Sequence, residues 1–552
     1  MKGGSLSPVD VGIVWDRLIT ISDEVFNTIV RTAFSVVVRE SRDACVVIMD
    51  AEGRSIAQSS QSLPGFLGVV PTTTRHMLCK FPKNKISPGD VLATNDPWMG
   101  PGQLNDIVIV TPIFAEGEIV SFAGTVSHLP DIGGAGYSAS SREVYEEGLN
   151  IPVSKIMVEG EINDQVFDFI QSNVRMQDQV TGDIKAAISA GRVCTKRIEG
   201  LVEALTFSGF EEICREILGR SKSLVLKKIS EMPRGVYEDT ICLESNSSTV
   251  RINCRISIEE SGIMVDFAGT SPQVAEAINV PLTFTAAWTC YAVKSAISPT
   301  IPNNQASSDL VTISAPEGSI LNAKRPAPVA ARHLVGHLLP PVVFGALSKP
   351  IPSQVMADSA GFSVVYFYGK NPRGEEYAVE LDTNGGLGAT FNSDGRSTRG
   401  FPTLAPNIPI EVWEYETGLL FESKRLRPDS GGAGESQGGQ GQIVEIRNRS
   451  TQPVVASVTI SKTQFPARGF LDGKDGAVKA VFIDGSIIHP RRNHILNPNQ
   501  VLRIEDGGGG GFGPPSRRDT ARIEEDLTNG IISSKFAEEK YNYFGRNRSI
   551  RF

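Results

Sequence analysis

Hydrophobic and polar positions along this chain follow two different periods. From Val9 to about Ser41, apolar residues recur at helical spacing in VDVGIVWDRLITISDEVFNTIVRTAFSVVVRES, which predicts one long or broken helix. The run CVVIMDAEGR is typical of a short buried strand closed by a turn. Residues 52–160 then alternate short strand-like runs with loops rich in glycine and proline. The N-terminal part is therefore expected to combine a helix with strands.

The rest of the chain continues this mixture. The spacing is helical between Asp183 and Lys228, becomes strand-like at 237–272, and is helical again at 283–297. Strands and glycine loops dominate from residue 310 onward, and RRDTARIEEDLTNGIISSKFAEEKYNYFG predicts a helix-turn-helix tail. No fixed-period repeat is present. The pattern predicts an α+β, multi-unit mixed fold with strand-rich units, a central helical segment and Gly-rich loops.

Length and composition set the class of protein. A chain of 552 residues is too long for one compact core. A net charge of −8 argues against nucleic acid as a partner, since phosphate binding needs clustered Lys and Arg. We expect five segments. These are an N-terminal α+β unit with a candidate metal site (1–180), a helical segment (181–235), an α+β middle unit (236–430), a β-rich glycine-loop unit (431–520) and a C-terminal helical tail (521–552).

The sequence also indicates the compartment. No apolar run reaches the eighteen residues of a membrane span, and the N-terminus lacks the layout of a secretory signal. The seven cysteines are scattered and form no CxxC pair, which favours reduced, mostly buried thiols. We therefore expect a cytoplasmic protein with no membrane partner.

Three polar residues at the ends of predicted elements are candidates for chemistry. Asp43 lies between the first helix and a strand, Asp106 follows the turn in TNDPWMGPGQLNDIVIV, and His128 ends the run VSFAGTVS. Taken singly, each is more often a turn, salt-bridge or hydrogen-bonded structural residue. Together, two carboxylates and an imidazole with an amide oxygen nearby suit a divalent ion such as Mn, Fe or Zn. Such a set leaves positions open for water or substrate, as in catalytic metal sites.

Other polar or glycine-rich stretches carry weaker signals. Asn95, Asp96 and Asp131 are expected in the second shell or as loop scaffold. The glycine runs GGAGESQGGQGQ and GGGGGFGPP contain no GxxxxGK[ST] motif, so we favour tight turns in a β domain and assign no ATP binding here. His333 and His337 can share one helical face, but without HExxH a packed or hydrogen-bonded pair is preferred over a second metal site.

Several motifs together resemble the hydantoinase B family. They are TNDPWMGPGQLNDIVIVTPIF, SHLPDIGG, REVYEEGLNIPVSKI, RDACVVIMDAEGRSIAQ, DSGGAGESQGGQGQIVEIRN and DGGGGGFGPPSRRD, and the resemblance covers essentially residues 1–540. The family includes the B subunits of ATP-dependent hydantoinases and N-methylhydantoinases, the matching half of 5-oxoprolinase, and related subunits of acetone and acetophenone carboxylases. The NDPW and HLPDIGG blocks are highly specific in combination.

The resemblance implies a mononuclear metal site on Asp43, Gln103, Asp106 and His128, with Asp106 and His128 essential for turnover. This chain departs from the family pattern at Gln103, where many relatives have His, and at Leu129, which replaces the second His of a pair. A neutral amide oxygen binds late transition metals less tightly than imidazole does. Three alternatives follow: a harder ion, a Gln103 that contacts substrate while water completes the shell, or a site that has lost its metal.

The resemblance also implies a partner. A hydantoinase A-like subunit would bind ATP and phosphorylate the enol-type oxygen of an amide, imide or ketone, and this chain would then act on the phosphorylated intermediate. The leading hypothesis is a subunit of an ATP-dependent cyclic-amide hydrolase in a hetero-oligomer. The alternatives are a subunit of an ATP-dependent ketone carboxylase, or a non-catalytic scaffold subunit.

Overall fold

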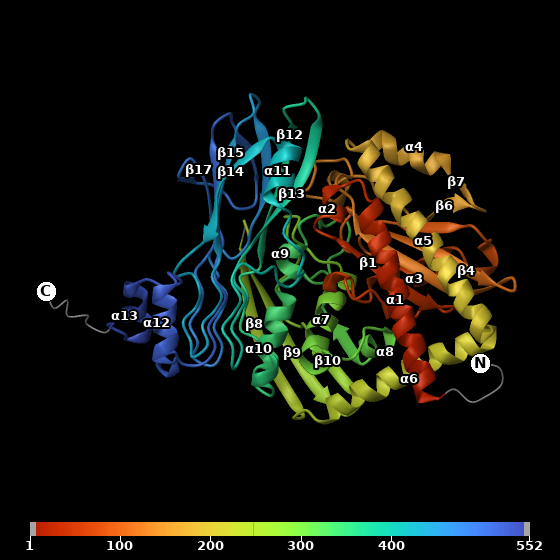
Figure 1. The fold of residues 1–552 in the computed structure, drawn as a ribbon, viewed down its shortest axis with the longest axis horizontal. Coiled ribbons are helices and arrows are strands. Elements are labelled where there is room, and N and C mark those ends of the chain that lie inside the picture. Colours follow the sequence, from red (N-terminus) through yellow and green to blue (C-terminus); the bar gives the residue numbers. More distant parts are fainter. Residues whose placement is uncertain (1–6, 247, 546–552) are drawn as a thin grey trace. The chain divides into compact units, whose positions relative to one another are not determined.

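A computed structural model describes residues 7–246 and 248–545. The chain packs as two compact units, and each contains both helices and strands (Figure 1). The predicted α+β class is therefore confirmed. Unit 1 comprises the described residues up to 236 together with 256–339, and unit 2 comprises 237–255 and the described residues from 340 onward.

Unit 1 is built around a seven-stranded antiparallel sheet in the order β2-β1-β5-β4-β3-β6-β7. Val46 and Ile48 enter one hydrophobic cluster, whereas Cys45 and Val47 enter another. Because successive side chains of a strand point to opposite faces, both faces of the sheet are buried. The strands are β1 (Ala44–Asp50), β2 (Ser55–Gln58), β3 (Val91–Thr94), β4 (Asp106–Ala115), β5 (Glu118–His128), β6 (Ser154–Val158) and β7 (Glu161–Ile162).

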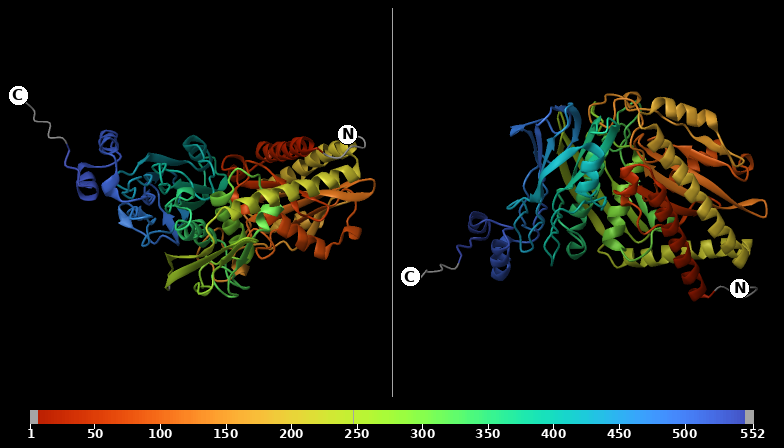
Figure 2. Two further views of the ribbon diagram at one scale, coloured as in Figure 1. Left: turned by 90° about the horizontal axis from the view of Figure 1, so that it is seen from below. Right: turned by 45° about the horizontal axis from the view of Figure 1, so that its top comes forward.

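Helices cover both faces of this sheet. Residues of α1, α5 and α6 share the cluster of Val46 and Ile48, and residues of α3 share the opposite cluster. In Figure 2, α1 (red) and α5 (yellow) lie on the same side of the orange strands. The helices of unit 1 are α1 (Pro8–Thr32), α2 (Val36–Arg39), α3 (Val69–Lys80), α4 (Asp164–Asn173), α5 (Gln177–Leu205), α6 (Phe207–Ser230), α7 (Leu282–Ile297), α8 (Gln305–Ser308) and α9 (His333–Gly336).

The predicted N-terminal helix is broken after Thr32. Asp183 on α5 accepts hydrogen bonds from the backbone amides of Phe34 and Ser35 at 2.7 and 3.2 Å. These amides are turned away from the helical hydrogen-bonding pattern, and Ser35 then caps the short helix α2. The break therefore results from a contact with a residue far along the sequence.

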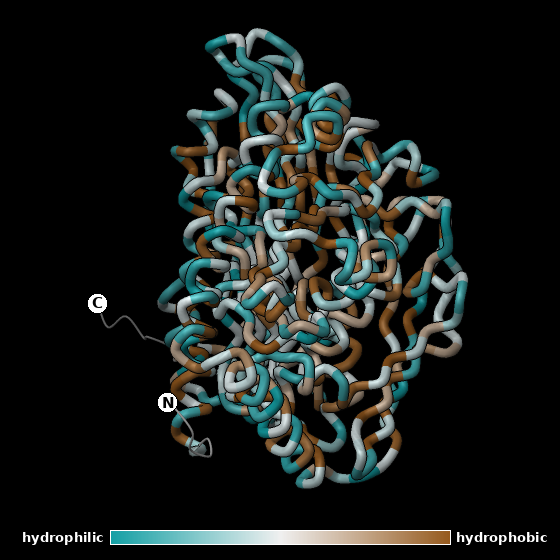
Figure 3. The backbone as a smooth tube through the Cα atoms, turned by 90° about the vertical axis from the view of Figure 1, so that its right-hand side faces the viewer, coloured by the Kyte–Doolittle hydropathy of each residue, from teal (hydrophilic) through white to brown (hydrophobic). Residues whose placement is uncertain are grey.

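Hydrophobic residues are distributed in short stretches along the chain, alternating with hydrophilic ones (Figure 3). Among the described residues, no helix combines the length and apolar character needed to cross a membrane.

Unit 2 contains two antiparallel sheets that contribute to one hydrophobic cluster, together with Trp413 of α11 (Ile410–Thr417). Val365 and Val458 come from the four-stranded sheet β13-β12-β16-β19, and Val444 and Ile504 from the five-stranded sheet β14-β15-β20-β17-β18. The strands are β12 (Phe362–Lys370), β13 (Glu376–Asn384), β14 (Leu419–Leu426), β15 (Gln442–Asn448), β16 (Val454–Thr459), β17 (Ala480–Ile483), β18 (Ser486–Ile487), β19 (Asn493–Leu496) and β20 (Val501–Glu505).

The remaining elements connect or extend these layers. Strand β9 carries the chain from unit 2 back to unit 1, where β10 pairs in parallel with β11. Two helices, α12 and α13, lie in the predicted helical tail, of which residues 546–552 fall outside the described part of the chain. The bounds are β8 (Gly235–Glu244), β9 (Thr249–Glu259), β10 (Gly262–Asp266), β11 (Val311–Ser314), α10 (Leu339–Leu347), α12 (Thr520–Thr528) and α13 (Ser534–Tyr541).

The glycine runs of unit 2 form a stack of extended segments, which we call the glycine stack (385–400, 430–441, 468–477 and 506–513). Within it, the amide of Gly509 donates to the carbonyl of Gly439 at 2.9 Å, and the amide of Gly432 donates to that of Gly509 at 2.8 Å. The predicted tight turns are wrong here, because the glycines from 507 to 511 do not have positive φ. Glycine is needed because neighbouring backbones approach too closely for a side chain.

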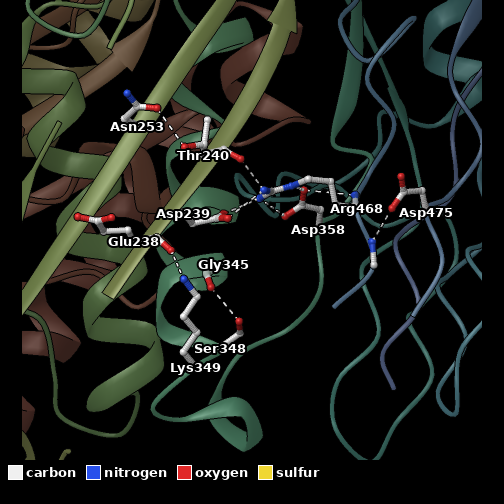
Figure 4. A network of polar contacts seen from close by, with 11 residues as sticks. Glu238, Asp239, Thr240, Asn253, Gly345, Ser348, Lys349, Asp358, Arg468 and Asp475 are labelled. Atoms are coloured by element: carbon white, nitrogen blue, oxygen red, sulfur yellow. Dashed lines mark hydrogen bonds and ion pairs between the residues drawn. The ribbon is translucent and has the colours of Figure 1, made fainter. Parts of the chain in front are cut away.

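A network of charged side chains connects the glycine stack to β8 within unit 2 (Figure 4). Arg468 pairs with Asp358 at 2.6 Å and with Asp239 at 2.9 Å. Asp239 packs closely on Gly345, where an added Cβ would lie 1.9 Å from a carboxylate oxygen. Two carboxylates raise the pKa of the Arg468 guanidinium against the effect of burial. The guanidinium therefore stays charged, whereas burial raises the pKa of the Asp239 carboxyl.

We predict that Gly509→Ala destabilises unit 2 strongly, because the new Cβ would lie 1.9 Å from the backbone oxygen of Leu387. Overpacking against backbone costs about 3 kcal/mol. The measurement is the midpoint of thermal unfolding of the full chain. The control is Gly219→Ala on the exposed side of α6, where an added Cβ has no neighbour within 4 Å and alanine favours the helix. Similar midpoints for both variants would contradict the prediction.

Candidate functional site

The predicted site residues lie at one edge of the unit 1 sheet. Strand β5 pairs antiparallel with both β1 and β4, so its end lies beside the starts of the other two. Asp106 is the cross-strand partner of His128, and the His128 amide donates to the carbonyl of Asp43 at 3.1 Å. Three residues that are distant in sequence are thereby brought to the same place.

Three side-chain atoms form a small triangle at this edge. Gln103 Nε2 lies 2.8 Å from Asp106 Oδ1 and 3.1 Å from His128 Nδ1, and Nδ1 lies 2.8 Å from the same Oδ1. All three side chains are almost fully buried. Burial opposes ionisation of both partners, but their mutual attraction raises the pKa of His128, and Arg332 and His128 lower the pKa of Asp106.

With Asp106 ionised, no arrangement of protons gives a hydrogen bond along all three contacts of this triangle. If His128 Nδ1 carries a proton, it donates to Asp106 but faces an N–H of Gln103. If Nδ1 is bare, it accepts from Gln103 but faces a lone pair of Asp106. Exchanging the oxygen and nitrogen of the Gln103 amide, which are assigned from hydrogen bonding, only moves the conflict to the contact with Asp106.

A cation would resolve this conflict. With the Gln103 oxygen turned inward, the triangle would present three lone pairs to one point. An octahedral ion bound at about 2.1 Å spaces adjacent ligands about 3.0 Å apart, close to the observed 2.8 and 3.1 Å. The Gln103 oxygen is buried without a hydrogen-bond partner, as expected for an unused ligand atom. The residues therefore fit a divalent ion.

Asp43 lies beside the triangle and differs from Asp106. One of its carboxylate oxygens is buried without a hydrogen-bond partner. Burial raises the pKa of Asp43 to about 6, although the nearby His128 opposes the shift. In the described part of the chain, no three His, Cys, Asp or Glu side chains are grouped closely enough to hold an ion. A ligand role for Asp43 therefore stays a prediction.

Arg332 is the main site residue that sequence reasoning missed. Its Nη2 lies 2.6 Å from Asp106 Oδ2, and its Nε donates to the Pro101 carbonyl at 2.7 Å. The guanidinium carbon lies 3.9 Å from the centre of the Phe284 ring, and the side chain is 4% exposed. A single Arg in the apolar run APVAARHLVGHLLPP was the available signal, because a buried Arg needs an anionic partner.

The expected scaffold residues shape the loops around the site. Asn95 donates to the Leu104 and Leu149 carbonyls and accepts from the Ile151 amide. Leu129 is fully buried in a hydrophobic cluster with no part in the triangle.

Asp96 and Asp131 hold these loops in place through hydrogen bonds and ion pairs. Asp96 pairs with Arg325 at 2.5 Å, and Arg325 stacks on Trp98. Asp131 accepts from the amide of Gly133 and from Arg175.

The His333 and His337 pair extends from the site through aromatic contacts. His333 Nδ1 lies 2.7 Å from the hydroxyl of Tyr137, whose ring packs edge-on against His128 with centroids 6.0 Å apart. His337 packs edge-on against Trp288. This agrees with the expectation of a packed, hydrogen-bonded pair.

Glu147 holds the segment that carries Arg332. Its Oε1 accepts hydrogen bonds from the amides of Val329 and Ala330 at 2.6 and 2.8 Å, whereas its Oε2 is buried without a partner. Burial raises the pKa of Glu147 to about 8. The segment is therefore fixed by a carboxyl group that keeps its proton at neutral pH.

The chain is similar over nearly its whole length to proteins of one family. A family model described as hydantoinase B/oxoprolinase matches residues 7–515. An uncharacterized protein of Methanocaldococcus jannaschii is 30% identical, over 97% of this chain and 96% of its own length. The putative B subunit of a D-/L-hydantoinase from a Pseudomonas species is 27% identical, over 97% of this chain and 95% of its own length.

Two solved structures share the fold. The crystal structure of the ATP-dependent caprolactamase from Pseudomonas jessenii has a TM-score of 0.92 and 25% identity, with 99% of this chain and 97% of that chain covered. An acetone carboxylase structure without nucleotide has a TM-score of 0.88, with 97% of this chain and 79% of that chain covered. At 17% identity, the second likeness concerns the fold alone.

We predict that Glu147→Gln stabilises the protein increasingly as pH rises. In the unfolded chain Glu147 ionises near its usual pKa of 4.5, whereas in the folded protein it ionises near 8. Between these values unfolding releases a proton, so wild-type stability falls as pH rises. Glutamine keeps the accepting oxygen and does not ionise. The difference between the unfolding midpoints of Glu147→Gln and the wild-type protein should therefore grow between these two pKa values and then level off. Glu118→Gln, at an exposed position, is the control; a constant difference for Glu147→Gln would contradict the prediction.

Proposed function

Because this chain belongs to the hydantoinase B/oxoprolinase family, we propose that it is the metal-binding subunit of an ATP-dependent cyclic-amide hydrolase. It would act in the cytoplasm, in a hetero-oligomer with a hydantoinase A-like subunit that binds ATP. The single observation that carries the proposal is the buried triangle of Gln103, Asp106 and His128, whose three contacts a bound cation would satisfy together. The similarity to a hydantoinase subunit and to caprolactamase supports a cyclic amide as substrate.

In this proposal Gln103, Asp106 and His128 hold a Mn, Fe or Zn ion. When bound, a divalent ion lowers the pKa of a coordinated water toward neutrality and polarises a substrate oxygen. Arg332 keeps the Asp106 carboxylate ionised and oriented, as groups around metal ligands do elsewhere. The buried setting excludes other water from the ligands.

In this proposal Asp43 transfers protons. Opening a cyclic amide requires removal of a proton from the attacking water and delivery of one to the leaving nitrogen. A buried carboxyl beside the triangle with an unpartnered oxygen could accept and return a proton. The partner subunit would first phosphorylate the amide oxygen, which removes amide resonance. Attack of one water and departure of the protonated ring nitrogen would then leave an acyl phosphate, and a second water would release the carboxylate and inorganic phosphate.

The fold shared with acetone carboxylase supports one alternative, a subunit of a ketone carboxylase. The deciding experiment is co-purification with the neighbouring hydantoinase A-like subunit, metal analysis, and a panel of hydantoins, lactams and ketones with ADP release as readout. Turnover of a lactam or hydantoin without bicarbonate supports the hydrolase. Bicarbonate-dependent turnover of a ketone would replace it with the carboxylase. Absence of stoichiometric metal in an active complex would remove the metal role.

We predict that Asp106→Ala and His128→Ala each lower turnover by about 100-fold or more, because each removes one corner of the triangle. Assembly stays intact in His128→Ala, whereas Asp106→Ala also leaves the buried Arg332 without its anionic partner and is compared only where the complex still forms. Turnover is measured as ADP-coupled product formation, and assembly by size-exclusion chromatography of the complex. The controls are Asp168→Ala and His76→Ala, which replace exposed residues of the same types. Retained turnover in either site variant would refute the metal role.

We predict that Gln103→His raises the affinity for Zn²⁺ or Mn²⁺ by about tenfold, since imidazole is a stronger ligand than an amide oxygen. Metal affinity is measured by titration of the chelator-treated protein, independently of activity. Gln165→His on the exposed side of α4 is the control for adventitious binding by a new histidine. Unchanged affinity would place Gln103 outside the ligand set.

A further inference from the structure

The two oxygens of the Asp106 carboxylate have different partners. Oδ2 is 2.6 Å from the guanidinium of Arg332, whereas Oδ1 contacts Gln103 and His128. Only Oδ1 therefore faces the point at which the triangle would hold an ion. Both members of the ion pair are nearly inaccessible to solvent, with 4% of the Arg332 side chain and 1% of the Asp106 side chain exposed.

The position of Arg332 is fixed by its surroundings. Its Nε donates to the Pro101 carbonyl at 2.7 Å, and its guanidinium carbon lies over the Phe284 ring, 3.9 Å from the ring centre. Gly102 has a φ of +86°, and a Cβ there would lie 2.8 Å from both Cδ and Nε of Arg332. The loop is thus shaped to receive an arginine, whose planar group can serve the carbonyl and the carboxylate together.

Divalent ions differ in how many oxygens of one carboxylate they bind. Ca²⁺ takes six to eight oxygen ligands and often binds both oxygens of one carboxylate. Smaller ions prefer fewer ligands in regular geometry and take one oxygen from each carboxylate. An arginine that occupies Oδ2 therefore blocks the two-oxygen mode that favours Ca²⁺.

We infer that Arg332 is a positioning residue that restricts Asp106 to a single ligand oxygen and thereby makes the site select Mn²⁺-sized ions over Ca²⁺. The inference rests on the proposed function, since it requires that the triangle binds a divalent ion. The inference adds to the proposed function the residue that sets ion selectivity. Arg332 would do so through Asp106, without touching the ion or the substrate.

The test compares two ions of equal charge. The full chain is treated with chelator, Mn²⁺ binding is followed by the electron paramagnetic resonance of free Mn²⁺, and Ca²⁺ affinity is measured by competition with Mn²⁺. Arg332→Met removes the guanidinium and frees Oδ2. The loss of one positive charge affects both ions alike, so the ratio of their affinities reports the coordination mode. We expect the Mn²⁺-over-Ca²⁺ ratio to fall by about tenfold in Arg332→Met.

Two further variants distinguish this role from a structural one. Arg332→Lys keeps a donor for Oδ2 and is expected to retain more of the wild-type ratio than Arg332→Met does. Arg325→Met removes the guanidinium that pairs with Asp96 at 2.5 Å and stacks on Trp98, and it should leave the ratio unchanged. If Arg332→Met weakens both ions equally, so that the ratio stays at the wild-type value, the inference is overturned.

The remaining outcomes are also decisive. Should Arg332→Met fail to fold, Phe284→Leu loosens the guanidinium while keeping its charge, and it is expected to lower the ratio by a smaller factor; an unchanged ratio overturns the inference. A wild-type chain that binds neither ion overturns both this inference and the metal part of the proposed function. A wild-type chain that binds Mn²⁺ with no change in any variant overturns the inference alone.

Discussion

The candidate site depends on the buried ion pair between Asp106 and Arg332. Burial alone would raise the pKa of Asp106, yet the guanidinium and the His128 imidazole hold it below its usual value. Asp43 is buried at the same edge with one oxygen unpartnered, and its pKa rises to about 6. One arginine thus separates the ionisation of two neighbouring carboxyl groups. Such a separation lets one serve as a permanent anion and the other exchange protons.

Local pattern made part of this arrangement predictable. Asp106 and His128 flank one antiparallel hairpin, so their positions at the ends of strand-like runs already indicated that they meet. Arg332 is 226 positions from Asp106, and no period or turn signal reports a contact over that separation. The break in the first helix has the same origin, because Asp183 captures the amide of Ser35 from 148 positions away. Contacts between distant segments are set by packing of the whole unit.

The glycine stack is a second feature whose contacts could not be predicted from the sequence. The sequence favoured tight turns for these glycines, whereas the structure shows that neighbouring backbone segments approach them closely. Neither a nucleotide nor a turn explains the run from 507 to 511; its close neighbours are the carbonyls of other backbone segments, such as that of Leu387 beside Gly509. A glycine loop identifies a steric requirement, and the partner that imposes it is defined only by the fold.

The charges around the triangle bear on what the proposed site would accept. Asp106 and Arg332 cancel each other, and Gln103 contributes no charge. Of the two carboxylates at this edge, only Asp43 is left to offset a divalent ion, and it supplies at most one negative charge. A loaded site would therefore carry a positive charge that a neutral lactam cannot neutralise. A phosphorylated amide brings the missing negative charge with it, so the same guanidinium that orders the ligand would also favour the activated substrate over its unactivated form.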